Sequence, residues 1–463
     1  MHAEPFVCYR PAPESAAEFA ALPYDVFDRE GAADYVREHP RSFLAIDRPE
    51  TGFSPDHDMY ACDVYAHAAE LLHERVADGT LVRDGRPCYY LYRLEQDGHE
   101  QTGIVAACSL DDYNNGVIRR HESTRRAKEE DRVRHIRATG CQTGPIFLAY
   151  RDNPALEALV EAAKGAEPLY DFTDGEGVRQ TVWRVARPAA VEAFQMMLAY
   201  ISRAYIADGH HRAASAARVC QEMRTEEGRE HTGREAYNYL LCVLFPASQL
   251  TVLPYERVVA DAAGMGEDEL VAAVAAAGFE VGPRREEPVE PGERGTFGMY
   301  AFGAWRELRF VDGDAVAGDP VARLDASVLQ DRVLGPVLGI GDPREDPRVS
   351  FVGGAAGLGE LERRAGRKGV AFALHATSVD ELMAVADAGL LMPPKSTWFE
   401  PKLRSGLFIR RIANKNTVID GVGRPAPRED SRGCRQGAAF RPGQARLGAC
   451  RKGQGRGREG RGG

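Results

Sequence analysis

Residues 203–217 read RAYIADGHHRAASAA, a pattern that predicts a short apolar strand, a tight turn and an alanine-rich helix. The first backbone N–H groups of such a helix have no partner within it and lie at the positive end of its dipole. They can therefore bind an anion. Asp208 can cap the helix, and Gly209 can take a positive φ or let a ligand approach the backbone.

The turn also concentrates polar side chains, because His210, His211 and Arg212 follow Gly209 directly. A guanidinium group binds phosphate through charge-assisted hydrogen bonds. An ordinary turn whose polar residues face water is the alternative. The density of Asp, Gly, His, His and Arg within five residues favours a phosphate-binding loop.

Length and composition limit the class of protein. The 463 residues, 44% of them hydrophobic, predict two or three domains with sizeable cores. No apolar stretch has the length of a membrane span, and the N-terminus lacks a basic region followed by an apolar one, so we expect a cytoplasmic protein without a membrane partner. The nine cysteines form no CxxC pair, which argues against a disulfide framework and against a structural zinc site.

Charge is unevenly distributed along the chain. Residues 414–463 hold twelve Lys/Arg and four Asp/Glu, a net charge of +8. The whole chain has a net charge of −10, so the residues before the tail carry a net charge of −18. An acidic body is a poor nucleic-acid surface, so we expect any contact with nucleic acid to involve the basic tail. The absence of apolar periodicity predicts a disordered Arg/Gly-rich tail over residues 413–463. The oligomeric state does not follow from the sequence.

Strand patterns alternate with helix patterns, which predicts a mixed α/β (α+β) fold. We expect helices over residues 59–77, 154–164, 189–200, 267–277 and 379–388, and strands over residues 41–50, 88–94, 103–108, 144–150 and 370–374. Asp97-Gly98 indicates a hairpin turn. We divide the chain into a phosphate-binding domain (1–245), a second mixed α/β domain (246–412) and the tail (413–463).

A second distinctive segment, residues 120–135, reads RHESTRRAKEEDRVRH. It is helical by propensity and has almost no apolar residues. At i, i+3 and i+4 spacing, one helix face would carry His121, Thr124, Lys128, Asp131, Arg132 and His135. A solvated helix held by ion pairs such as Glu129 with Arg132 is an equally supported interpretation.

Several motifs together resemble the bacterial family called domain of unknown function 1015. They are PYDV (23–26), SFL (42–44), HExTRxxKExDRxxH (121–135), ADGHHR (207–212) and MPPKST (392–397). The resemblance extends over nearly all of the chain before the tail. One departure is the segment LPYER (253–257), where relatives tend to carry Thr-His before the arginine.

The loop at residues 208–212 is also similar to the loop of the ParB/sulfiredoxin superfamily. In that superfamily the matching Gly, His and Arg hold nucleotide phosphates. Its members include kinases of free serine, nucleotide-gated DNA clamps and the ATP-using repair enzyme sulfiredoxin. The resemblance implies a ParB/sulfiredoxin-like N-terminal domain that binds ATP or a related nucleotide.

We therefore expect a phosphotransferase that binds a phosphorylated small-molecule ligand, with Mg²⁺, and acts on a small metabolite, serine or phosphoserine being the first choice. The expected phosphate contacts are Gly209, His210, His211 and Arg212, with Lys128 and Arg132 as a second cationic arm. The expected catalytic groups are Glu122 as base, His121 and His135 as acid–base partners, and Asp208. Asp131 and Asp208 are the expected Mg²⁺ contacts.

Two other functions remain open. One is a hydrolase of phosphorylated substrates with a His/Asp metal site, although the sequence has no HxH, HExxH or DxDx spacing. The other is a non-enzymatic ParB-like module that senses nucleotide or associates with DNA. The acidic body and the lack of a recognisable helix-turn-helix argue against DNA.

Overall fold

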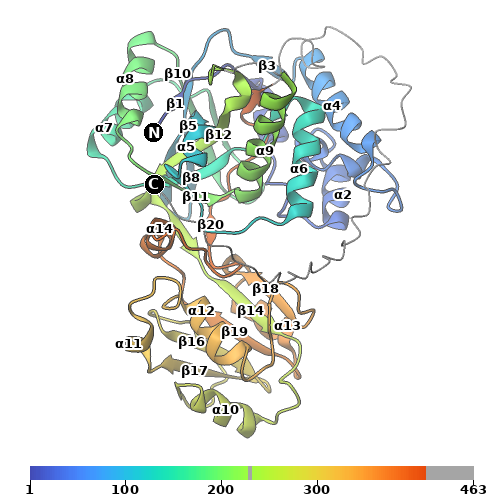
Figure 1. The fold of residues 1–463 in the computed structure, drawn as a ribbon. Helices are drawn as coiled ribbons and strands as arrows, with labels where there is room; N and C mark the ends of the chain where they lie inside the picture. Colours follow the sequence, from blue (N-terminus) through green and yellow to red (C-terminus); the bar gives the residue numbers. More distant parts are fainter. Residues whose placement is uncertain (228–231, 413–463) are drawn as a thin grey trace, which may run out of the picture. The chain divides into compact units, whose positions relative to one another are not determined.

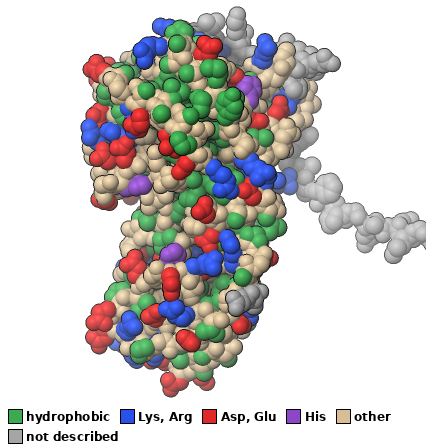
Figure 2. Space-filling view, turned by 90° about the vertical axis from the view of Figure 1, so that its left-hand side faces the viewer, with side chains coloured by type: hydrophobic (Ala, Val, Ile, Leu, Met, Phe, Trp, Pro, Cys, Tyr) green, Lys and Arg blue, Asp and Glu red, His purple; other side chains and the backbone are tan. Residues whose placement is uncertain are grey.

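A computed structural model of the chain describes residues 1–227 and 232–412 (Figure 1). The predicted tail over 413–463 lies outside these residues. The fold is mixed α/β, as predicted from the alternation of strand and helix patterns. No helix in the described residues combines the length and the apolar character needed to cross a membrane. Figure 2 shows acidic and basic side chains interspersed over one face of the molecule.

A nine-stranded mixed sheet organises the first part of the chain. Its order is β6 (Ile118–Arg119), β11 (Ala204–Asp208), β8 (Ile146–Tyr150), β12 (Tyr239–Pro246), β5 (His99–Ser109), β4 (Tyr89–Gln96), β10 (Arg179–Val185) and β9 (Tyr170–Thr173), with β1 (Ala3–Glu4) also paired to β5. Two pairs, β11 with β6 and β12 with β8, are parallel, and the others are antiparallel. The central strands are buried on both faces, which explains their continuous apolar runs.

Alternate side chains of these strands enter two separate cores. On β11, Ile206 packs into one core and Tyr205 into the other. The helix α9 (His210–Glu227) contributes Ala213, Ala216 and Val219 to the first core. Next to α9 lies α6 (Arg126–Thr139), which also packs on α4 (Cys62–Ala77), as Figure 1 shows. The remaining helices of this part are α1 (Ala16–Phe19), α2 (Arg29–Glu38), α3 (Leu44–Asp47), α5 (Leu110–Asn114), α7 (Pro154–Lys164) and α8 (Pro188–Ala199).

A second, six-stranded antiparallel sheet is formed by residues that follow β12. Its order is β15 (Phe279–Val281), β17 (Ala304–Phe310), β16 (Thr296–Ala301), β19 (Val370–Leu374), β14 (Tyr255–Val259) and β18 (Val349–Gly353). The helices of this region are α10 (Glu267–Ala276), α11 (Gly313–Val316), α12 (Asp325–Leu329) and α13 (Leu358–Ala365). This sheet has its own apolar clusters on its two faces.

After this sheet the chain returns to the first core. The helix α14 (Val379–Asp387) places Leu382 and Met383 in the same cluster as Tyr205 of β11. The strand β20 (Trp398–Glu400) pairs with β13 (Thr251–Leu253). The strand β21 (Ile409–Arg411) joins β2 (Cys8–Pro11), β3 (Leu81–Arg83) and β7 (Cys141–Gln142) in a four-stranded antiparallel sheet. Residues 379–412, which we assigned to the second predicted domain, therefore pack with the first sheet.

Asp387 at the end of α14 binds side chains of the first part of the chain and so holds the C-terminal segment against it. Its carboxylate lies 3.1 Å from guanidinium nitrogens of both Arg151 and Arg203, and 3.4 Å from Nε of Arg119. The hydroxyl of Tyr205 donates to the same carboxylate at 3.0 Å. Four groups, from β6, from β11 and the residue before it, and from the residue after β8, thus hold one carboxylate of the C-terminal segment.

Several predicted elements are confirmed with their bounds, among them the helix over 154–164 and the strand over 370–374. The Asp97-Gly98 hairpin is also confirmed, with φ of 51° and 79° at the two turn residues. The predicted strand over 41–50 is wrong, because residues 44–47 form α3. Phe43 and Leu44 are fully buried in a core under α2 and α4. A short apolar run carries no periodicity that separates a buried strand from a buried helical turn.

The predicted helix over 120–135 is wrong in its first part, because α6 begins at Arg126. The backbone is extended at Arg125, and the carbonyl of His121 accepts a hydrogen bond from the N–H of Met392 at 2.8 Å. His121 and Thr124 consequently do not share a helical face with Lys128. The tertiary contact holds the segment in a conformation that its propensity does not predict.

Gly103 on β5 tests the packing between the central strands. A Cβ at this position would lie 2.5 Å from Cγ1 of Val243 and 2.7 Å from Cζ of Phe245, both on β12. Gly103→Ala should therefore lower the free energy of unfolding by about 1–3 kcal/mol, the usual range for overpacking. Chemical denaturation measures the change. The control is Gly85→Ala, where no atom lies within 4 Å of the added Cβ, and equal stability of the two variants would contradict this packing.

Candidate functional site

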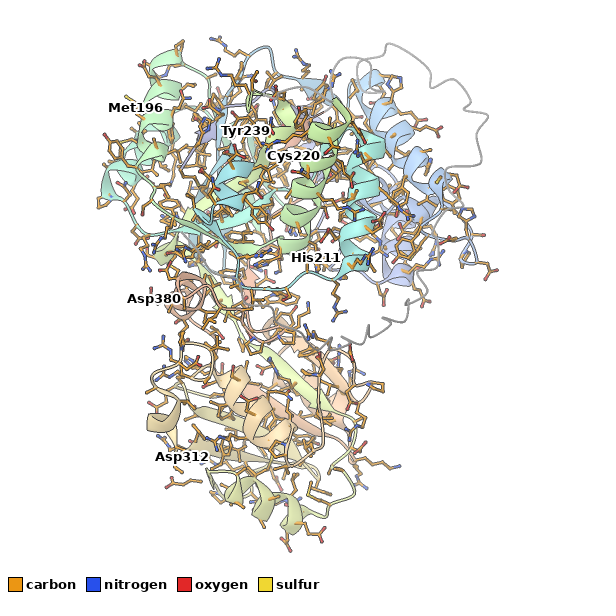
Figure 3. All side chains as sticks on the ribbon, in the orientation of Figure 1. Met196, His211, Cys220, Tyr239, Asp312 and Asp380 are labelled. Carbon is orange, nitrogen blue, oxygen red and sulfur yellow. The ribbon has the colours of Figure 1, made fainter. Side chains whose placement is uncertain are left out.

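The turn between β11 and α9 has the form that the sequence predicts. Gly209 has φ of 94°, in the left-handed region. A Cβ there would lie 3.1 Å from Nε of Arg212, because the arginine side chain folds back beneath the turn. Glycine is therefore required at this position both for the backbone and for the space. The turn starts α9 at His210, and Figure 3 shows His211 at that end of the helix.

The N-terminus of α9 forms one wall of a cleft built from five separate segments of the chain. The lining residues are Tyr24, Asp25, Glu122, Ser123, Thr124, Arg125, Lys128, Asp208, Gly209, His210, His211, Arg212, Arg344, Met392, Pro394 and Lys395. The structure thus brings Lys128 and Arg212 to the same cleft, although more than eighty residues separate them in the sequence.

Three cations in the cleft have no carboxylate paired with them among the described residues: Arg125, Lys128 and Lys395. Partial burial lowers the pKa of Lys128, and the charges of Lys395 and Arg125 lower it further, although Asp25 opposes them. The ammonium of Lys395 donates to the hydroxyl of Tyr255 at 3.0 Å. Crowded cations of this kind are stabilised by a bound anion.

Arg212 is committed to groups within the protein. Its guanidinium donates to the carbonyl of Pro145 and, at 3.3 Å, to the carboxylate of Asp208. Lys402 approaches the same carboxylate at 4.0 Å. Burial opposes ionisation of Asp208, but the charges of Lys402 and Arg212 hold its pKa well below the ordinary value. This geometry matches an internal ion pair that shapes the turn.

The three histidines of the cleft region are neutral near pH 7. Burial lowers the pKa of His121 and of His211 to about 4 each, and the charge of Lys128 also acts on His211. Burial also lowers the pKa of His210 well below its ordinary value, and so does His121, whose ring packs edge-on at 4.5 Å. His210 and His211, which line the cleft, can therefore offer neutral N–H groups to a ligand but no positive charge, whereas His121 is buried and does not line it.

Glu122 and Asp25 supply carboxylates to the cleft. Burial raises the pKa of Glu122 and nearby Asp208 raises it further, while Lys395 opposes them. One Glu122 oxygen lies 3.8 Å from Nδ1 of His210. A carboxylate with a raised pKa is suited to accept a proton near neutral pH. Asp25 is exposed at the cleft.

Three residues that we expected in the site face a different cluster. Arg132 is buried, pairs with Asp131 at 2.8 Å and stacks on the ring of Tyr24 at 4.1 Å. Asp131 also accepts a hydrogen bond from Tyr65 at 2.8 Å. Nε2 of His135 lies 2.8 Å from the carbonyl of Ile46, and burial lowers its pKa. None of the three lines the cleft, because they lie about one turn or more beyond Lys128 along α6, where the helix packs on α4 and where Arg132 and His135 contact carbonyls of α3.

The structure adds residues that sequence reasoning did not assign to the site: Asp25, Arg125 and Arg344. Asp25 lies in the PYDV motif and Arg125 in the motif over 121–135, so the motifs carried a signal for both. Arg344 belongs to a loop without such a signal. Among the described residues, no group of three or more His, Cys, Asp or Glu is placed to hold a metal ion.

We compared the chain with models of known protein families. A family model described as "Protein of unknown function (DUF1015)" matches residues 3–327, which include the turn at Gly209 and the motif over 121–135. A comparison with curated protein sequences gave no match.

Solved structures show distant similarity. A mutant of free serine kinase in complex with ADP is 15% identical, with 64% of this chain and 87% of that chain covered and a TM-score of 0.31. A conserved hypothetical protein from Pyrococcus furiosus is 14% identical, with 66% and 95% covered and a TM-score of 0.32. SbnI with a C-terminal truncation from Staphylococcus aureus is 14% identical, with 68% and 91% covered and a TM-score of 0.34.

Arg212→Lys tests the internal role of the guanidinium. A lysine cannot bond Asp208 and the carbonyl of Pro145 in one planar arrangement, so the free energy of unfolding of the empty protein should fall by about 1.5–3 kcal/mol. Denaturant unfolding measures this change, with the exposed Arg367→Lys as control. Unchanged stability combined with weaker phosphate binding would assign Arg212 to the ligand instead.

Proposed function

The chain belongs to the family described as Protein of unknown function (DUF1015), and we propose that its cleft binds the phosphates of a nucleotide or of a phosphorylated metabolite. The observation that carries this proposal is the position of Arg125, Lys128 and Lys395 around the N-terminus of α9, unpaired with carboxylates in the described residues. Phosphate oxygens would neutralise these cations and accept hydrogen bonds from the first N–H groups of the helix.

We further propose that the cleft transfers a phosphoryl group to the hydroxyl of a small metabolite. Glu122 takes the hydroxyl proton as the hydroxyl oxygen bonds to phosphorus, while the bond from phosphorus to the leaving oxygen breaks and that oxygen retains the electron pair. The cations stabilise the charge on the transferred group. Free serine is the first acceptor to examine, since the loop at residues 208–212 resembles that of a superfamily with serine kinases.

The residues of the cleft also indicate which carboxylates could hold the expected Mg²⁺. This ion is commonly held by one or two carboxylates together with substrate phosphates, whose charge it neutralises. Asp131 is paired with Arg132 outside the cleft, and Asp208, which lines the cleft, is paired with Arg212, so both expected ligands are already engaged in ion pairs. Asp25 is exposed at the cleft and would take their place beside the phosphates.

Lys128→Ala tests phosphate binding. Removal of one charged contact should weaken the affinity for ATP or ADP roughly ten- to a hundred-fold, with the fold intact. Calorimetric titration measures the affinity, after a thermal-shift screen of ATP, ADP, CTP, phosphoserine and serine with and without Mg²⁺. Lys368→Ala is the matched control, because Lys368 is exposed and does not line the cleft. Equal affinities of the two variants would refute the phosphate contact.

Glu122→Gln separates binding from transfer. The amide preserves the shape of the side chain but cannot accept the proton, so the rate of phosphoryl transfer to serine should fall about a hundredfold or more while nucleotide affinity changes little. A coupled assay for ADP release measures the rate. A variant that transfers phosphate at the wild-type rate would remove Glu122 from the role of base.

A further inference from the structure

A second cavity, of about 830 Å³, lies where the first strands of the chain meet the last described strand. Its walls include Arg83 on β3, Arg410 on β21 and Tyr239 on β12. No residue that lines it also lines the cleft at α9. The proposed phosphotransfer site therefore leaves this cavity without a role.

Arg410 is the unusual residue of the cavity. It is only 5% exposed, and its guanidinium donates to two backbone carbonyls, those of Tyr239 at 3.2 Å and Ala236 at 2.6 Å. Its buried Nε has no hydrogen-bond partner, and no carboxylate in the described residues pairs with it. Burial lowers the pKa of Arg410 to about 10. A buried guanidinium without a counter-ion is costly unless an anion reaches it.

The charged residues of the cavity walls also favour an anionic ligand. Arg83 and Arg234 are exposed at the cavity, and neither forms an ion pair within the part of the chain that the structure describes. Glu4 is the one acidic lining residue among those described, and it accepts hydrogen bonds from Gln195 at 2.9 and 2.8 Å. Arg83, Arg234 and Arg410 against Glu4 leave two positive charges in excess, before Arg411, which also lines the cavity, is counted.

The cavity also has an apolar side. Pro5, Val7 and Pro87 line it beside the ring of Tyr239, over which Arg410 lies 5.6 Å from the centroid. An inorganic anion would leave these groups in contact with water. A ligand with both an anionic and an apolar part would cover both kinds of wall.

We propose that this cavity is a second binding site, for an organic phosphate monoester. The dianionic phosphate contacts Arg83, Arg234 and Arg410, since the planar guanidinium matches phosphate oxygens pairwise. The organic group lies against Pro5, Val7 and Pro87. This site is independent of the cleft at α9 and does not require that the chain be a phosphotransferase.

Site-resolved arginine labelling tests the proposal. Phenylglyoxal modifies exposed arginines, and peptide mass spectrometry of the full chain reports each position with and without phenyl phosphate or inorganic phosphate. Phenyl phosphate should protect Arg83 and Arg234 at about tenfold lower concentration than inorganic phosphate, because its ring buries apolar surface. Arg367, exposed and outside both sites, should remain unprotected. Protection of Arg125 reports the cleft at α9 separately.

Each result has a defined meaning. Failure of either phosphate to protect Arg83 and Arg234 would overturn the site, whatever happens at Arg125. Equal protection by the two phosphates would overturn the organic part of the ligand. In Arg83→Ala the protection of Arg234 should require at least about tenfold more phenyl phosphate, since one charge-assisted contact is lost. Unchanged protection of Arg234 in this variant would show that the two arginines do not share a ligand, and Lys128→Ala should have no effect there.

Discussion

The cleft depends on the turn at Gly209, where a positive φ allows the guanidinium of Arg212 to lie directly beneath the backbone. The contacts of Arg212 with Asp208 and with the carbonyl of Pro145 join the end of β11 to the start of β8. The direction of α9, and with it the direction of its first N–H groups, follows from that connection. A side chain at position 209 would adopt an unfavourable positive φ and would press on the guanidinium of Arg212.

The groups around the turn have two distinct electrostatic environments. Buried charges on α6 are compensated within the protein, as in the pair of Arg132 with Asp131. The charges of Arg125, Lys128 and Lys395 face the cleft without such compensation in the described residues. The helix α6 therefore supplies a neutralised buried face and, through Lys128 together with the preceding Arg125, uncompensated charges at its exposed start. This separation distinguishes a structural cation from one available to a ligand.

Local signals explain what the sequence predicts well. The turn at Gly209, the helix over 154–164 and the hairpin at Asp97-Gly98 depend on residues near in sequence. The late start of α6 depends instead on a hydrogen bond between His121 and Met392, which no local pattern contains. For the same reason sequence spacing places Arg132 and His135 in the site, although Arg132 stacks on Tyr24 and His135 lies at hydrogen-bond distance from the carbonyl of Ile46, both on other segments. The candidate residues were predictable as motifs, but their distribution between cleft and core was not.

The return of the chain after residue 378 has a consequence for biosynthesis. The strand β21 pairs with β2 and β7, and Phe408 packs against Tyr90 and Tyr92 of β4. A nascent chain that has emerged only through β12 contains every strand of the nine-stranded sheet but lacks β21 and Phe408, so the four-stranded sheet and the packing of Phe408 on β4 are completed late. The six-stranded sheet, whose strands all lie between residues 255 and 374, has all its partners earlier on the ribosome.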